Sequence, residues 1–339
     1  MVAFAISVTN AYMNLPGKGR RADPGVGGDR DADLSRHKHS IYPAHGSDER
    51  LMMMRQNDEG AGPVPELAMV HRSSPVGIVN ATSWCTTMPE IDPRTRYRTQ
   101  RKTIGTITPS GNIVVERMTT AILADFPVVS GHFSRIEVVG STDAYKDDYD
   151  WDGMMRAADL LSHADPDVIC WNGSKGGSIG LDTDRHLCER IMAATGKPAT
   201  TSSLAIPEAF ATTGVRRFGL VTPYASRYAS RIPPHFCAQG HACVAQAHAG
   251  LSDNLSYCTI ADADIIAMVR TVAVEQPNAI ILYCTNFPGA HLVAEVEAEI
   301  GVPIYDSVSA CVWKCLRLFG EPTSAGGRLG SLFTDKRFG

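Results

Sequence analysis

A cysteine stands where a buried strand is expected to end. Residues 280–283 form a short apolar run, and Cys284, Thr285 and Asn286 follow it before a Pro-Gly turn. Such a run is typical of a strand in a parallel sheet, and ligands bind at the carboxyl edge of such sheets. A thiol at this edge can act as an acid, a base or a nucleophile, depending on its pKa. The alternative is a packed thiol, because free cysteine is among the most buried residue types.

Three further loops of small polar residues follow apolar runs, at residues 109–112, 172–178 and 223–224. Their neutral hydrogen-bond donors, with those of the loop after residue 283, include Asn112, Ser174, Tyr224, Thr285 and Asn286. Several such donors, together with backbone N–H groups, can stabilise a carboxylate or an oxyanion without a metal. Taken singly, each of these residues also fits ordinary turn chemistry.

Two other patterns raise the question of a ligand site. The loop 173–178 contains three glycines and Lys175, which could bind an anion or be a solvated surface lysine. The loop has neither the Walker spacing nor the dinucleotide fingerprint, so phosphate binding is disfavoured. The order Cys-x3-His-x-Cys-x4-His at residues 237–248 fits none of the usual zinc patterns. We therefore expect no metal site.

The composition is that of a globular protein. The 339 residues are 44% hydrophobic with a net charge of −4, and no apolar run approaches the ~20 residues that span a bilayer. The nine cysteines are an odd number without framework spacing, which suits free thiols in a reducing compartment. We expect a cytoplasmic protein with no nucleic-acid partner and no membrane partner, and a homo-oligomer is left open.

Alternating strand and helix patterns begin near residue 103 and position these loops. We expect strands at residues 102–108, 133–139, 166–171, 199–203, 216–222, 243–247, 280–283 and 302–306, with helices between them. A strand followed by a Thr-Pro turn occurs at Thr108 and again at Thr222, and a strand followed by a polar loop occurs after Trp171 and after Tyr283. This layout predicts an α/β fold with two similar doubly wound parallel-sheet domains and an active site in the cleft between them.

The expected domain boundaries follow from these patterns. The first domain covers residues 101–215 and is completed by a C-terminal helix at 305–322; the second covers 216–304; residues 323–339 form a tail. Residues 1–100 include a long stretch rich in Gly, Asp, Arg and His with few aliphatic side chains. Such a segment buries too little apolar surface to offset its ordering entropy, so we expect a largely disordered N-terminal arm.

Residues 103 to about 320 resemble the aspartate/glutamate racemase superfamily, in its maleate isomerase and arylmalonate decarboxylase branch. The matching pieces occur in the family's order: residues 108–112 with Glu116, the glycine loop after residues 167–171, residues 221–224 and residues 283–285. The resemblance implies an enzyme without a cofactor that acts on a small dicarboxylic acid. It also implies up to two cysteines, one from each domain, on opposite faces of the substrate.

The second of these cysteines corresponds to Cys284. The first would fall at Gly173 and is absent, since Cys170 lies three residues earlier, inside the expected strand. Racemisation by two bases needs a proton acceptor on one face and a donor on the other. Isomerisation of maleate, as the resemblance implies, begins with a cysteine adding to the double bond. Decarboxylation of a malonate needs one thiol only, which protonates the enediolate left after CO2 departs.

The favoured interpretation is therefore an arylmalonate-decarboxylase-like enzyme in which Cys284 is catalytic. The carboxylate and the oxyanion would be bound by Asn112, Gly173, Ser174, Lys175, Tyr224, Thr285 and Asn286. Lys175 departs from the decarboxylase, which has a neutral hydroxyl residue there. The alternatives are a maleate cis-trans isomerase, an amino-acid or hydantoin racemase and, from another class, a non-catalytic carboxylate-binding protein.

Overall fold

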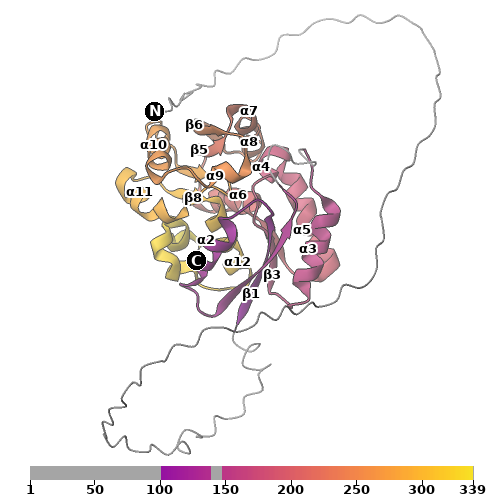
Figure 1. Cartoon of the computed structure of the whole chain (residues 1–339). Helices are drawn as coiled ribbons and strands as arrows, with labels where there is room; N and C mark the ends of the chain where they lie inside the picture. Colours follow the sequence, from indigo (N-terminus) through magenta and orange to yellow (C-terminus); the bar gives the residue numbers. More distant parts are fainter. Residues whose placement is uncertain (1–100, 139–146, 339) are drawn as a thin grey trace, which may run out of the picture. The chain divides into compact units, whose positions relative to one another are not determined.

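The computed structural model describes residues 101–138 and 147–338, which belong to one compact unit. The N-terminal arm that we expect to be disordered, residues 1–100, lies outside the described residues. The described chain contains two four-stranded sheets, both parallel throughout, with strand orders β2-β1-β3-β4 and β6-β5-β7-β8 (Figure 1). The predicted α/β fold with two similar parallel sheets is confirmed.

The first sheet is built from the chain up to residue 213. Its strands are β1 (Lys102–Pro109), β2 (Val129–Ile136), β3 (Val168–Trp171) and β4 (Ala199–Thr201). Its helices are α2 (Val115–Leu123), α3 (Trp151–Ser162), α4 (Gly176–Ile179), α5 (Leu181–Thr195) and α6 (Ser202–Thr213). The strand expected at 133–139 begins at Val129 instead, because β2 is an edge strand whose half-exposed polar residues hide its first half.

The second sheet repeats the same order of elements. Its strands are β5 (Arg217–Tyr224), β6 (Ala242–Leu251), β7 (Ala279–Leu282) and β8 (Ile304–Asp306). Its helices are α7 (Ser226–Ala229), α8 (Ile232–Cys237), α9 (Asn254–Tyr257), α10 (Asp262–Ala273), the 3-10 helix η2 (Ala290–Leu292), α11 (Val293–Ile300) and α12 (Ser307–Leu318). No helix in residues 101–138 and 147–338 is long and apolar enough to cross a membrane.

Strand β3 is buried on both faces, and its side chains alternate between two hydrophobic clusters. Val168 and Cys170 contribute to the larger cluster, which includes residues of α2, α6, α12 and the second sheet. Ile169 and Trp171 contribute to a smaller cluster with residues of α3 and α5. Because successive strand residues point to opposite faces, the Cys170 thiol and the Trp171 indole lie on different sides of the sheet.

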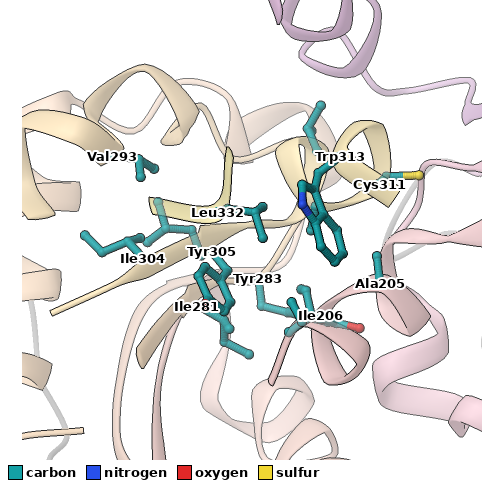
Figure 2. Packing of buried hydrophobic residues seen from close by; sticks show 14 of the residues in the cluster. Ala205, Ile206, Ile281, Tyr283, Val293, Ile304, Tyr305, Cys311, Trp313 and Leu332 are labelled. Atoms are coloured by element: carbon teal, nitrogen blue, oxygen red, sulfur yellow. The ribbon is translucent and has the colours of Figure 1, made fainter. Parts of the chain in front are cut away.

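Helices α6 and α12 pack against each other and join the two sheets in the larger cluster. Each begins directly after the last strand of its sheet: Thr201 accepts a hydrogen bond from the N–H of Leu204, and Asp306 accepts one from the N–H of Ser309. Figure 2 shows Trp313 of α12 among the buried side chains of this cluster, with Ile206 of α6.

Residues 323–338, which we expected to be a tail, form the short helices η3 (Thr323–Leu329), α13 (Ser331–Thr334) and η4 (Lys336–Phe338). Leu332, Phe333 and Phe338 are buried, and the Phe338 ring meets the Trp313 indole edge-on at 4.7 Å between centroids. This segment is therefore folded against α12. The exact domain boundaries stay a prediction, because one compact unit holds both sheets.

Candidate active site

Loops from the carboxyl ends of both sheets line one cavity of about 280 Å³. Six of the predicted site residues line it: Asn112, Ser174, Lys175, Tyr224, Cys284 and Thr285. Two predicted residues do not, namely Gly173 and Asn286. The cavity thus lies where parallel sheets place ligands, at the ends of the strands.

Cys284 follows β7 by two residues, and its side chain is almost fully buried. The backbone N–H of Asn286 donates a hydrogen bond to its Sγ at 3.3 Å. Burial raises the pKa of the Cys284 thiol to about 12, against the opposing effects of the Tyr224 hydroxyl and the Asn286 N–H. The thiol is therefore protonated near neutral pH, which suits a proton donor better than a nucleophile.

The Tyr224 hydroxyl lies beside this thiol, and Ser174 lies beside Tyr224. Ser174 Oγ and the Tyr224 hydroxyl are 3.0 Å apart, and both side chains are buried. Burial, followed by the interaction with Cys284, raises the pKa of Tyr224 well above its usual value. The phenol keeps its proton and can donate it in a hydrogen bond to a negatively charged oxygen.

Asn112 and Asn286 join the two halves at this site. Asn112 Nδ2 donates to Thr285 Oγ1 at 3.1 Å, while its Oδ1 accepts from the N–H groups of Val114 and Val115 at the start of α2. Asn286 Oδ1 accepts from the N–H of Ile113 at 3.1 Å. Asn286 is therefore placed to hold the loops together, whereas Asn112 also lines the cavity.

The cavity wall carries two cations, Lys175 and Arg231. Arg231 also forms an ion pair with Asp147, with 2.6 Å between Nη2 and Oδ1. Among the described residues, no aspartate or glutamate lines the cavity. Because the lining holds cations and hydroxyl donors, it favours an anionic ligand over a cationic one.

Sequence reasoning missed several large side chains of the lining, which come from the end of β3, from α7 and the residue before α8, and from α9. These residues are Trp171, Tyr228, Arg231, Asn254 and Tyr257. Asn254 has the clearest polar role, because its side-chain Nδ2 is buried and has no hydrogen-bond partner among the described residues. Its position gave no signal, because the strand was expected to end at residue 247, whereas β6 continues to Leu251.

The glycines of the loop 173–178 have a structural cause that the phosphate hypothesis did not consider. A Cβ at Gly173 would lie 2.2 Å from the Trp171 ring, and one at Gly177 would lie 2.0 Å from the Tyr283 hydroxyl. A Cβ at Gly176 would lie 2.1 Å from Oδ1 of Asp184. These three glycines therefore let buried side chains approach the backbone closely.

Within the described residues, one group of three side chains has the spacing to hold a metal: Cys170, Cys311 and Cys315. Their sulfur atoms lie within 4.8 Å of one another and are buried in the larger hydrophobic cluster. None of the three lines the cavity. The expectation that Cys170 does not reach the site is therefore met by the geometry.

Comparisons with known proteins show the family to which this chain is related. A sequence profile of the arylmalonate decarboxylase family matches residues 110–333. A maleate isomerase from Nocardia farcinica is 24% identical over 66% of this chain and 92% of its own length. An arylmalonate decarboxylase from Bordetella bronchiseptica is 28% identical over 42% of this chain and 60% of its own length.

Solved structures share the fold. A maleate isomerase from Pseudomonas putida S16 aligns with a TM-score of 0.64 at 24% identity, over 69% of this chain and 98% of that one. A Nocardia farcinica maleate cis-trans isomerase mutant with a covalently bound succinylcysteine intermediate aligns with a TM-score of 0.61 at 22% identity, over 68% and 98%. With the family profile covering most of the described residues, the chain belongs to the arylmalonate decarboxylase family, whose relatives are decarboxylases and isomerases.

Proposed function

We propose that this protein decarboxylates a substituted malonate and that Cys284 protonates the enediolate that results. The observation that carries the proposal is a single cysteine among the described residues of the cavity lining, buried and with a pKa raised to about 12. A protonated thiol is an acid ready to donate, and decarboxylation requires one such donor.

The reaction balances with this one acid. The bond between the α-carbon and one carboxylate breaks, CO2 leaves, and the electron pair stays on the α-carbon as an enediolate. The S–H bond of Cys284 then breaks as its proton moves to that carbon. The thiolate recovers a proton from water, so that one proton is consumed for each CO2 released.

Hydrogen-bond donors around the cavity stabilise the charge that develops. The hydroxyls of Ser174 and Tyr224 lie 3.0 Å from each other, close enough to bind the two oxygens of one enediolate. Thr285 and Asn112 add a hydroxyl and an amide from the two halves. Lys175 and Arg231 supply positive charge for the departing carboxylate or for a further acidic group on the substrate.

Isomerisation is the second candidate, because two of the relatives are named maleate isomerase. A covalent cysteine intermediate of the kind seen in the Nocardia structure requires a thiolate to attack carbon. The raised pKa of Cys284 opposes this step, and the cavity lining has no second thiol from residues 101–138 or 147–338. Racemisation meets the same obstacle, since it requires two proton-transferring groups.

A carboxylate-binding protein without activity is the alternative of another class. It would retain the hydroxyls and cations of the cavity and would not depend on the Cys284 proton. Thiol reactivity alone does not separate this alternative from an enzyme, because a buried acid is also slow to react. Turnover must therefore be measured directly.

The test is a screen of substituted malonates, maleate and acidic amino acids in deuterated buffer. We expect CO2 release from a malonate, with one deuterium at the α-carbon, and no such release with the Cys284→Ser variant. Conversion of maleate to fumarate without CO2 release would assign the isomerase. Binding of a dicarboxylate without turnover of any compound would assign the binding protein.

A further inference from the structure

The two sheets have the same strand order, so equivalent positions of the two halves can be compared at the site. Strands β3 and β7 hold the same place in the orders β2-β1-β3-β4 and β6-β5-β7-β8. Cys284 comes two residues after Leu282, the end of β7, and Gly173 comes two residues after Trp171, the end of β3. Gly173 is therefore the counterpart of Cys284 in the first half.

The space at Gly173 is filled by the side chain of Trp171, the last residue of β3. A Cβ built on Gly173 would lie 2.2 Å from Cζ2 and 2.3 Å from Cε2 of Trp171. Trp171 lines the cavity, whereas Gly173 does not. The first half thus presents an indole at the point where the second half presents a thiol.

Buried hydrogen bonds hold this indole in place. Trp171 Nε1 donates to the Tyr149 hydroxyl at 3.2 Å, and that hydroxyl donates to Asp184 Oδ1 at 2.5 Å. Thr201 Oγ1 donates to the other carboxylate oxygen at 2.5 Å. The rings of Tyr149 and Trp171 also meet edge-on at 5.9 Å. To leave its position, the indole would have to break a hydrogen bond in a buried cluster, which is costly.

We propose that Trp171 is the selectivity residue of this site: its indole closes the position of a second proton donor, so that Cys284 protonates one face of the enediolate only. The inference rests on the proposed decarboxylation. The indole N–H does not replace a thiol as the acid, because it points to the Tyr149 hydroxyl and is hydrogen-bonded there. An unsymmetrical disubstituted malonate should therefore give a single enantiomer.

The first experiment needs no turnover. The Gly173→Cys variant and the Trp171→Ala/Gly173→Cys double variant are treated with iodoacetamide, and labelling of position 173 is followed by mass spectrometry with and without malonate. We expect the double variant to be labelled at least about tenfold faster, with protection by malonate. Equal labelling in both variants, at an unchanged melting temperature of Gly173→Cys, would overturn the placement of the indole.

The second experiment uses the wild-type chain and Tyr149→Phe, which removes the acceptor of the indole N–H and keeps the ring. Its control is Tyr305→Phe, which removes a buried hydroxyl outside the cavity, bound to Thr213. With an unsymmetrical malonate, we expect the enantiomeric excess to fall in Tyr149→Phe while kcat changes by less than about threefold.

Unchanged enantiomeric excess in Tyr149→Phe, together with an unchanged excess in Trp171→Ala, would overturn the selectivity role. A merely structural role would lower the melting temperature and kcat without altering the excess. If the wild-type chain turns over no malonate, the proposed function fails, and the labelling experiment still decides where the indole lies.

Discussion

The two halves of the molecule share a topology and differ at the residues that meet the cavity. After β7, the second half places Cys284, Thr285 and Asn286; after β3, the first half places Gly173, Ser174 and Lys175. In the proposed reaction, the second half supplies the acid, and the first supplies a hydroxyl, a cation and an indole wall. Under the proposed function, the two copies of a repeated scaffold have separate roles: one edge moves a proton while the other binds the substrate and shields it.

The difference is sharpest at Cys284, so its removal should have the largest effect. Replacing Cys284 by Ser should lower kcat/KM by about 10⁴-fold, the upper end for general acid catalysis, because no other thiol of the described chain lines the cavity. Steady-state kinetics with the best malonate measures this. Cys188→Ser is the matched control, since Cys188 is buried on α5 and away from the cavity. If Cys284→Ser retained activity within tenfold of the wild type, Cys284 would not be the acid, and the proposed difference between the two halves would be wrong.

The thiol itself should report its protonation state. Because burial raises the pKa of Cys284 to about 12, the thiolate fraction at pH 8 is about 10⁻⁴. Alkylation of Cys284 should be about 10³-fold slower than that of a free cysteine in a short peptide and should rise about tenfold per pH unit up to pH 11. Peptide mass spectrometry at several pH values tests this, and a plateau below pH 8 would contradict it.

The binding role of the hydroxyls should give a smaller loss. Tyr224→Phe removes one donor to the enediolate and should lower kcat by about 10²-fold with little change in KM. Tyr305→Phe serves as the control, because its hydroxyl bonds Thr213 and does not line the cavity. A rise in KM at unchanged kcat would show that Tyr224 binds substrate and transition state equally.

The smallest predicted effect concerns a buried carboxyl in each half. Burial raises the pKa of Asp184 and of Asp306 to about 6, so the folded state holds more protons than the unfolded state between about pH 4 and 6. Stability should therefore fall as pH rises through this window. In Asp184→Asn, we expect this loss to be smaller by on the order of 1 kcal/mol, with the share of Asp306 remaining. Urea unfolding at pH 4, 5, 6 and 7 measures it, and identical slopes would refute it.

Much of the fold was predictable because buried parallel strands have short, continuous apolar sequences. The runs at 166–171 and 280–283 indicated the positions of Gly173 and of Cys284. The repeated Thr-Pro pair indicated two similar units, although in both halves it belongs to the end of a strand and not to a turn. The predicted range of β2 was shifted toward the C-terminus, because an edge strand needs no such apolar run. The cavity lining was predictable close to the end of a strand, as for Ser174 and Thr285, each three residues beyond one.

The remaining site residues depend on contacts that no local pattern encodes. Trp171 read as the last residue of a buried strand, and only the packing against Tyr149 and Gly173 places its ring at the cavity. Arg231 and Asn254 reach the lining from segments that carry no motif. The pKa of Cys284 also depends on its surroundings. Burial raises it, and of the two groups that lower it, only the Asn286 N–H is close in sequence, whereas the Tyr224 hydroxyl comes from β5.

The contact between Gly173 and Trp171 also bears on how such a site can change over generations. A glycine codon can become a cysteine codon by one base change, yet a side chain at position 173 collides with the indole. A second thiol would therefore be acquired only after, or together with, the loss of Trp171. The two positions are therefore epistatic: the effect of a cysteine at position 173 depends on which residue occupies position 171.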